Sequence, residues 1–235
     1  MTRILTLIIA FFLFLEVNGQ WLGTIKDPDG YTNLREEPSI KSKIVGQFYD
    51  DEIFQIGDLD YDTIPNWRKV GRWYPERRES KGGWMHVSRI QDLDYLPEPV
   101  RPKLSEDGKI LTAKNDTIFF QIVFEDFDST KHEIVRSEHG YIRTIDGKYP
   151  QGTDGYMPRE GIKSVTFQMN GKTVQFPKEA YFDLFNFRKN TFLFLLNRPT
   201  GTIMIRSYNS DGAGHYMLVW KFKNYEYSGR FLGSL

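Results

Sequence analysis

The chain has 235 residues, which suits two modest domains, because single cores usually run to about 100 to 150 residues. Its 31 basic and 31 acidic residues balance, which excludes the overall field that draws a protein to nucleic acid or to an anionic membrane. Aromatic residues make up 15% of the chain, and with Thr, Ile, Val, Gly and Pro they favour strands and turns. We therefore expect an all-β protein whose partners bind at local sites.

The first twenty residues, MTRILTLIIAFFLFLEVNGQ, have the layout of a secretory signal peptide. Arg3 precedes an apolar run from Ile4 to Leu15, and a Val-x-Gly ending places small residues at the cleavage position. The alternative is a membrane anchor, but the run is shorter than the roughly 18 residues that a spanning helix needs. The sequence predicts a signal peptide over 1–19, cleavage after Gly19, and a secreted or periplasmic mature chain without a membrane span.

The chain contains no cysteine. Small domains that eukaryotic cells secrete usually depend on disulfides, and a bacterial lipoprotein carries its lipid on a cysteine. A bacterial periplasm or the exterior of a bacterial cell therefore fits the sequence best.

Short apolar stretches alternate with turn signals from Trp21 to about residue 93. The successive pieces are WLGTIK, DPDG, YTNLRE, PSIKS, KIVGQF, DDE, IFQI, NWRKV and KGGWMHVSRI. Strands this short and closely spaced indicate a small barrel or sandwich, with one face of each strand packed inward. The residues expected to fill its core are Leu34, Ile44, Val45, Ile53, Ile56, Val70 and Val87, with Trp84 mostly in the core as well.

The order of these pieces resembles the bacterial SH3-like (SH3b) domain. The resemblance is carried by an Asn-Leu-Arg strand, a Pro-Ser turn, an Ile-Val-Gly strand, an Asp-Glu before another apolar strand, Trp-x-x-Val, and Gly-Trp-Met-His-Val-Ser. It covers residues 21–93, about a third of the chain. The resemblance implies a half-open barrel of five or six strands, which often serves as a targeting module for cell-wall peptidoglycan or for a protein ligand.

The segment between Val70 and Gly82 departs from that pattern, because GRWYPERRES replaces a much shorter hairpin. Its arginines and aromatic rings would form a cationic tip that binds an anion or stacks on a sugar; the alternative is a solvated hairpin end. A peptide groove would be lined by aromatic residues from the loops, whereas Trp67 has a strong claim to the core. The candidate ligand-binding residues are Tyr31, Tyr61, Trp73 and Arg72.

Residues 94–108, DYLPEPVRPKLSEDG, contain three prolines and alternating charges with almost no apolar periodicity. Such a stretch is typical of a semi-extended spacer that holds two domains apart or fixes their angle. The domain boundary is therefore predicted near residue 100. The first domain then spans 20–93 and the second 109–235.

The second domain reads as β-rich. SVTFQMNGKTVQF, residues 164–176, predicts a hairpin in which Asn170-Gly171 supplies a type I′ turn. PKEAYFDLFNF, from Pro177, has apolar residues at helical spacing and predicts one short helix. Residues 191–232 read as four strands joined by turns, so we expect an antiparallel sheet or sandwich.

Two loops of this domain, residues 146–160 and 209–216, place aspartates beside glycines. Such pairs mark plain turns, because glycine takes positive φ and the carboxylate caps its own turn. The alternative is a hard cation such as calcium, although neither loop has the spacing of the calcium-binding loop. The side chains that would bind it are Asp146, Asp154, Asn209 and Asp211. We expect plain turns and no metal or other cofactor.

The sequence lacks the signatures of the common cell-wall peptidases. A thiol peptidase is excluded by the lack of cysteine, and Gly-x-Ser-x-Gly is absent. The histidines are widely spaced, with no zinc-binding helical pair; they are His86, His132, His139 and His215. The catalytic alternative is an acid-base site for a glycosidic bond. Its candidate residues are Asp154, Glu160, Asp211 and His215.

Two hypotheses follow from these patterns. The preferred one is an exported, non-catalytic binding protein whose SH3-like module engages peptidoglycan or an envelope protein. The alternative is a cell-envelope hydrolase with its acid-base site in the second domain. Neither hypothesis involves nucleic acid, and the sequence leaves the oligomeric state open.

Overall fold

The computed structural model describes residues 21–57, 64–74, 79–98, 100–210 and 212–233. The predicted signal peptide lies outside these residues. Within them the protein is all-β, as predicted, and its helical elements are single 3-10 turns. No helix in the described ranges is long and apolar enough to cross a membrane.

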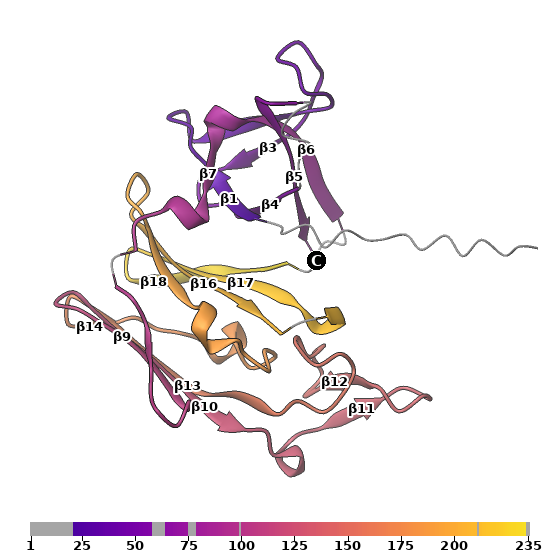
Figure 1. Ribbon diagram of the computed structural model, residues 1–235, viewed down its shortest axis with the longest axis vertical. Helices are drawn as coiled ribbons and strands as arrows, with labels where there is room; N and C mark the ends of the chain where they lie inside the picture. The colour runs from indigo at the N-terminus through magenta and orange to yellow at the C-terminus, as the bar shows by residue number, and fades with distance from the viewer. Residues whose placement is uncertain (1–20, 58–63, 75–78, 99, 211, 234–235) are drawn as a thin grey trace, which may run out of the picture.

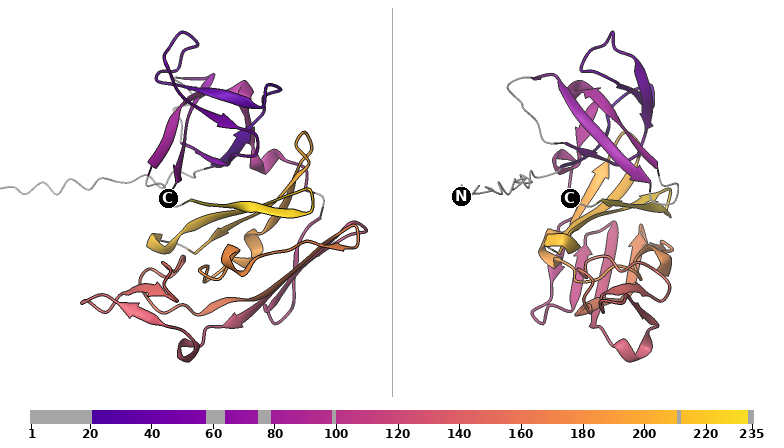
Figure 2. Two further views of the ribbon diagram at one scale, coloured as in Figure 1. Left: turned by 180° about the vertical axis from the view of Figure 1, so that it is seen from behind. Right: turned by 90° about the vertical axis from the view of Figure 1, so that its right-hand side faces the viewer.

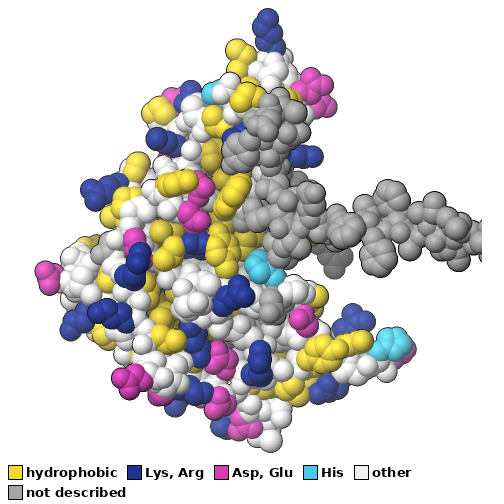
Figure 3. Space-filling model, viewed as in Figure 1, with side chains coloured by type: hydrophobic (Ala, Val, Ile, Leu, Met, Phe, Trp, Pro, Cys, Tyr) yellow, Lys and Arg dark blue, Asp and Glu magenta, His cyan; other side chains and the backbone are white. Residues whose placement is uncertain are grey.

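The chain forms three layers (Figure 1). A curled seven-stranded sheet makes a half-open barrel, a four-stranded antiparallel sheet lies in the middle, and a five-stranded antiparallel sheet forms the opposite layer. The two views in Figure 2 show the same order of layers. Basic and acidic side chains are interspersed over the face seen in Figure 3.

The barrel sheet has the strand order β3-β2-β6-β5-β4-β1-β7. Its strands are β1 (Trp21–Ile25), β2 (Tyr31–Arg35), β3 (Ile44–Tyr49), β4 (Phe54–Ile56), β5 (Trp67–Tyr74), β6 (Glu79–His86) and β7 (Ile90–Asp92). The 3-10 turns η1 (Val87–Arg89) and η2 (Leu93–Tyr95) flank β7. The buried side chains inside it are Ile25, Leu34, Phe48, Phe54, Ile56, Val70 and Met85.

The barrel core differs from the predicted one in four places. Ile53 packs against the four-stranded sheet and not inside the barrel, because the neighbouring Phe54 takes the inward position. Ile44 and Val45 are 48% and 45% exposed, because β3 is an edge strand and a bulge shifts its register against β2. In β6 the alternation of side chains turns Met85 inward and leaves Trp84 half-buried on the other face. Val87 is half-buried in η1, because the strand ends one residue before it.

Two side chains cover the open edge of β3. Lys81 Nζ donates to the Gln47 carbonyl oxygen at 2.7 Å and pairs with Glu52 at 3.1 Å. The Glu52 carboxylate also accepts hydrogen bonds from the Tyr49 backbone N–H at 2.8 Å and from the Tyr74 hydroxyl at 2.7 Å. Two backbone groups of this strand, the Gln47 carbonyl and the Tyr49 N–H, therefore have side-chain partners.

The other two layers belong to the second half of the chain. The middle sheet contains β15 (Leu193–Asn197), β16 (Thr202–Asn209), β17 (Tyr216–Lys223) and β18 (Glu226–Gly233), in that order. The outer sheet, in the order β14-β13-β10-β9-β8, contains β8 (Lys103–Leu104), β9 (Ile110–Lys114), β10 (Ile118–Asp126), β13 (Glu160–Met169) and β14 (Lys172–Thr173). A separate hairpin joins β11 (Ile134–Arg136) to β12 (Ile142–Ile145). Further 3-10 turns are η3 (Ser129–Lys131), η4 (Lys178–Ala180), η5 (Lys189–Thr191) and η6 (Gly212–Gly214).

The predicted hairpin over 164–176 is confirmed. β13 pairs with β14, and Asn170 and Gly171 have φ angles of 50° and 72°. The short helix predicted from Pro177 is the single turn η4. The chain bends after it, because Phe185 bridges to another strand at Gly161 instead of continuing a helix.

The middle sheet is buried on both faces. Its face toward the outer sheet packs in an aromatic core that includes Phe120, Phe167, Phe194, Trp220 and Phe222. On its other face, the barrel and the segment after it contribute Leu22, Ile53, Leu93 and Leu96. These contact Leu195, Met204, Met217, Val219 and Phe231. The barrel and the middle sheet therefore share one hydrophobic core.

Asp51 fastens the barrel to the middle sheet. Its carboxylate accepts hydrogen bonds from Thr200 at 2.7 Å and Asn197 at 3.4 Å, and pairs with Lys223 at 3.0 Å. Its carbonyl oxygen accepts a hydrogen bond from Lys221 Nζ at 2.8 Å. Burial raises the pKa of the Asp51 carboxyl, but the hydrogen bonds outweigh it and hold that pKa below its ordinary value. The contact therefore depends on a charged carboxylate.

Residues 94–108 run along the middle and outer sheets. Asp94 pairs with the buried Arg206 of β16 at 2.9 Å. The Pro97 carbonyl oxygen accepts a hydrogen bond from the Leu196 N–H at 2.9 Å. Farther along, β8 pairs with β9. The described residues of this segment therefore pack against both sheets, and two of them form a strand of the outer sheet.

Candidate functional site

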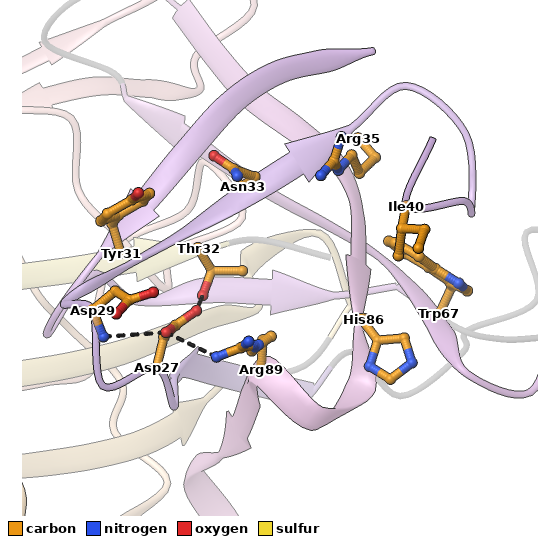
Figure 4. A pocket seen from close by; sticks show the side chains of 10 residues that line it. All are labelled: Asp27, Asp29, Tyr31, Thr32, Asn33, Arg35, Ile40, Trp67, His86 and Arg89. Atoms are coloured by element: carbon orange, nitrogen blue, oxygen red, sulfur yellow. Dashed lines mark hydrogen bonds and ion pairs between the residues drawn. The ribbon is translucent and has the colours of Figure 1, made fainter. Parts of the chain in front are cut away.

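A cleft of about 230 Å³ lies on the outer face of the barrel (Figure 4). Tyr31, Asn33 and Arg35 of β2 line it, because Thr32 and Leu34, which alternate with them, are buried. Side chains at every second position of a strand point to one face. The strand YTNLR therefore presents an aromatic ring, an amide and a guanidinium in a row.

Asp27 organises one end of the cleft. Its carboxylate accepts hydrogen bonds from the Thr32 hydroxyl at 2.9 Å, from Arg89 Nη1 at 2.9 Å and from the Asp29 backbone N–H at 3.2 Å (Figure 4). The chain turns here at Gly30, which has a φ of 76°. Asp27 therefore holds the Arg89 side chain at the wall of the cleft and balances its charge.

Trp67 and His86 stand at the other end of the cleft. They are cross-strand partners of β5 and β6, and their rings meet edge to face with centroids 5.4 Å apart. His86 Nδ1 accepts a hydrogen bond from the Ser88 backbone N–H at 3.3 Å. In the neutral ring the proton is therefore assigned to Nε2. Ile40, 73% exposed, lines the same end.

Hydrogen bonds fix the polar groups between the two ends. Arg35 Nη1 donates to a backbone carbonyl oxygen at 2.8 Å. Gln47 Nε2 donates to Asn33 Oδ1 at 2.9 Å, and the Tyr49 hydroxyl donates to Gln47 Oε1 at 3.0 Å. The Tyr31 and Tyr49 rings lie 6.4 Å apart. The outer face of β2 and β3 is thus a preorganised strip of planar polar groups beside two tyrosines.

The predicted ligand-binding residues do not share one site. Tyr31 lines the cleft, and so does the half-buried Trp67, which the sequence assigned to the core. Tyr61 lies outside the described residues. Trp73 is exposed at the opposite end of β5 from Trp67, beside the groove over β4, β5 and β6.

Arg72 is turned toward the middle sheet. Its guanidinium carbon lies 4.7 Å from the centroid of the Tyr74 ring and 5.5 Å from that of Phe231. Its Nη1 donates to the Ile53 carbonyl oxygen at 3.4 Å. The side chain of Arg72 therefore packs between the barrel and β18.

Sequence reasoning missed most of the cleft. Asn33 and Arg35 share the two-residue alternation with Tyr31, and that signal would have found them. Asp27, His86 and Arg89 come from other segments. The turn before β2 places Asp27, because the Gly30 N–H donates to the Asp27 carbonyl oxygen. Strand pairing brings His86 and Arg89 to the cleft, and the local sequence carries no sign of that.

The acid-base candidates of the second domain are partly brought together. An added Cβ at Gly214 would lie 2.9 Å from Asp154 Oδ1, so this carboxylate packs against the turn that precedes His215. Burial, and to a lesser extent Arg188, lowers the pKa of His215. Asp211 lies outside the described residues.

Glu160 has a separate environment. Its carboxylate accepts a hydrogen bond from Lys189 Nζ at 2.6 Å, and Lys189 also donates to the Gly108 carbonyl oxygen at 2.7 Å. This ion pair links β13 to η5 and to the turn before β9. Glu160 therefore has a clear structural role.

Two of the side chains considered for a cation, Asp146 and Asn209, have hydrogen-bond partners within the protein. Asp146 accepts hydrogen bonds from the Glu133 N–H at 2.9 Å and lies 2.7 Å from His132 Nδ1. Burial raises the pKa of Asp146, but these two contacts outweigh it and lower that pKa. Asn209 Oδ1 accepts a hydrogen bond from the Arg188 N–H at 3.2 Å. Among the described residues, no three His, Asp or Glu side chains are grouped as a metal site would require.

Comparison with known proteins identifies no relative. No protein-family model and no curated protein matches the chain. The half-open barrel is a feature of the structure, whereas its kinship with bacterial SH3-like domains stays a prediction from the sequence.

Proposed function

We propose that this protein is an exported, non-catalytic binding protein of a bacterial cell envelope, and that its SH3-like barrel binds cell-wall peptidoglycan. The observation that supports the proposal most is the cleft on β2, which combines Tyr31 and Trp67 with hydrogen-bonded amide and guanidinium groups. A sugar ring has an apolar face that packs on aromatic rings, and hydroxyls that bond to planar polar groups. The cleft offers partners for both.

The charges of the cleft also suit peptidoglycan, whose peptides carry carboxylates. The positive charge of Arg89 is balanced by the Asp27 carboxylate, 2.9 Å away. The hydrogen bond of Arg35 described above goes to a neutral carbonyl oxygen. A guanidinium binds a carboxylate through two parallel hydrogen bonds. Arg35 is therefore the residue that we expect to meet a ligand carboxylate.

Of the two acidic residues that line the cleft, Asp27 and Asp29, the less exposed Asp27 has a positioning role. Three donors engage the Asp27 carboxylate, which gives it the role of positioning Arg89. A general acid or base needs a carboxyl free to exchange a proton with the substrate. Incubating the mature protein with peptidoglycan is expected to release no soluble fragments, and their release would contradict the non-catalytic part of the proposal.

Binding is tested by sedimenting residues 20–235 with purified peptidoglycan. The full chain is needed, because a barrel cut at residue 98 would expose the core that it shares with the middle sheet. Tyr31→Ala and Arg35→Ala are each expected to weaken binding about tenfold. Tyr95→Ala is the matched control, because Tyr95 is 82% exposed and lies outside the cleft.

Two outcomes would contradict the proposal in different ways. If the wild-type chain does not sediment with peptidoglycan, wall binding is wrong and an envelope protein becomes the expected partner. If it sediments and both cleft variants match the control, the ligand binds elsewhere on the molecule. Export is tested by sequencing the amino terminus of the protein from a bacterial host, which is expected to begin at Gln20.

A further inference from the structure

A second groove, of about 370 Å³, lies on the outer face of β4, β5 and β6. Its floor has no side chains where Gly71 of β5 pairs with Gly82 of β6. Trp73 and Ser80 pair in the next row on the same face, and Lys69 lies two residues before Gly71. On an extended strand, the Cα atoms of Lys69 and Trp73 are about 13 Å apart. The groove is therefore an open trough between an aromatic wall and a cationic wall.

Among the described residues, nothing requires glycine at position 71. Its φ is not in the left-handed region, and in this part of the chain an added Cβ would meet only the Lys81 carbonyl oxygen, at an ordinary 3.7 Å. By contrast, a Cβ at Gly82 would lie 3.0 Å from the Val70 carbonyl oxygen, and one at Gly83 would come within 2.8 Å of another backbone oxygen. Glycine weakens a strand that could carry a side chain. What Gly71 provides is an open floor.

The walls of the groove present two kinds of chemistry. Trp73 is 50% exposed, although Val70 and Tyr74 on the other face of β5 are buried. Lys69 is exposed at the opposite end. Among the described residues that line the groove there is no carboxylate. An aromatic face beside a cation suits a ligand that has an apolar ring face and a negative charge.

We propose that this groove binds a sugar ring that carries a carboxylate. The ring lies on the glycine floor with its apolar face against Trp73, its hydroxyls reach Ser80, and its carboxylate meets the Lys69 ammonium. The site is separate from the cleft on β2, so it stands or falls independently of the peptidoglycan proposal.

The test uses residues 20–235 and two soluble probes, the acidic tetragalacturonate and the neutral chitotetraose. Titration calorimetry, with tryptophan fluorescence as a second readout, is expected to show binding of the acidic probe. Gly71→Val is expected to weaken that binding at least about tenfold. The melting temperature is expected to stay the same or rise, because valine suits a strand. A loss of binding with retained stability separates a blocked groove from a damaged fold.

Further variants test the contribution of each wall of the groove, and a control and a fallback variant guard against loss of folding. Trp73→Ala is expected to weaken binding of the acidic probe about tenfold, and Lys69→Gln to remove the preference for that probe over the neutral one. Tyr31→Ala, in the β2 cleft, is the control and is expected to bind as the wild type does. If Gly71→Val melts early, Gly71→Ala replaces it. Failure of the wild type to bind tetragalacturonate, or unchanged binding by both Gly71 variants, would overturn the proposal.

Discussion

At the scale of single residues, Asp51 has both an unusual backbone conformation and a charged contact between the barrel and the middle sheet. Its φ of 61° is left-handed, a conformation that Asp and Asn tolerate better than most residues do. Its carboxylate meets Thr200 and Lys223 of the middle sheet. The substitution Asp51→Asn therefore keeps the shape and the backbone preference of the side chain but removes its negative charge.

Asp51→Asn is expected to lower stability near neutral pH by about 2 kcal/mol. The pKa of Asp51 in the folded protein lies below the ordinary 3.8, so its ionised form stabilises the fold. That contribution is complete above pH 3.8 and is lost as the pH falls through the folded-state pKa. Urea unfolding between pH 7 and pH 3 is expected to show a difference in free energy of unfolding between wild type and variant that narrows as the pH falls below the ordinary pKa of 3.8. Asp50→Asn, at an exposed neighbour, is the control, and a gap independent of pH would contradict the linkage.

Substitutions at Gly152 and Gly140 separate the cost of backbone strain from the cost of a steric clash of the added Cβ. Both are left-handed, with φ angles of 84° and 83°. An added Cβ at Gly152 would collide with the Phe185 carbonyl oxygen and lie 2.9 Å from Tyr216 Cε1, whereas at Gly140 it would meet no atom of the described residues within 4 Å. Gly140→Ala is expected to cost about 1 kcal/mol and Gly152→Ala about 2 kcal/mol more. Equal losses in chemical denaturation would show that the packing around Gly152 yields easily.

At the scale of elements, the middle sheet is the most protected part of the molecule. In β16 every residue except Tyr208 is buried, and β17 is buried along most of its length. The hairpin of β11 and β12 has exposed residues in both strands. Amide hydrogen exchange is expected to be slowest in β16 and β17 and much faster in β11 and β12. Exchange in β17 as fast as in β11 would contradict this order.

Local signals in the sequence predict several of these elements correctly. Asn170-Gly171 marks a turn, because both residues accept the left-handed backbone of a type I′ turn. The helix expected after Pro177 shows where local spacing is insufficient. The apolar residues of that segment pack between layers, and the bridge from Phe185 to Gly161 replaces helical hydrogen bonds. Such contacts depend on residues that are distant in sequence.

The same distinction governs the candidate site. Tyr31 was predictable as an exposed aromatic residue on an alternating strand. Its partners His86 and Arg89 were not, because they approach only when β2 and the strands around it close into the barrel. Arg72 shows the reverse case. A charged residue near a hairpin tip is expected to be exposed to solvent. Because β18 packs against the barrel, the Arg72 side chain contacts Phe231 instead.

At the scale of the whole molecule, the shared core predicts one unfolding event. Ile53 and Leu22 of the barrel pack with Met204 and Met217 of the middle sheet. Calorimetry of residues 20–235 is expected to give a single transition whose van't Hoff and calorimetric enthalpies agree. Ile53→Ala is expected to cost about 3 kcal/mol and to shift the whole transition. Two separate transitions would show that the barrel folds independently.

The pairing of Lys81 with Glu52 bears on how copies of the protein behave beside one another. An uncovered edge strand is a template onto which another chain can add, and repeated addition leads to fibres. Here the Lys81 ammonium donates a hydrogen bond to the Gln47 carbonyl oxygen, and the Glu52 carboxylate accepts one from the Tyr49 N–H. An incoming strand would have to displace both charged groups. The pair that completes the open side of the barrel thus also protects a concentrated solution of the protein from aggregation through β3.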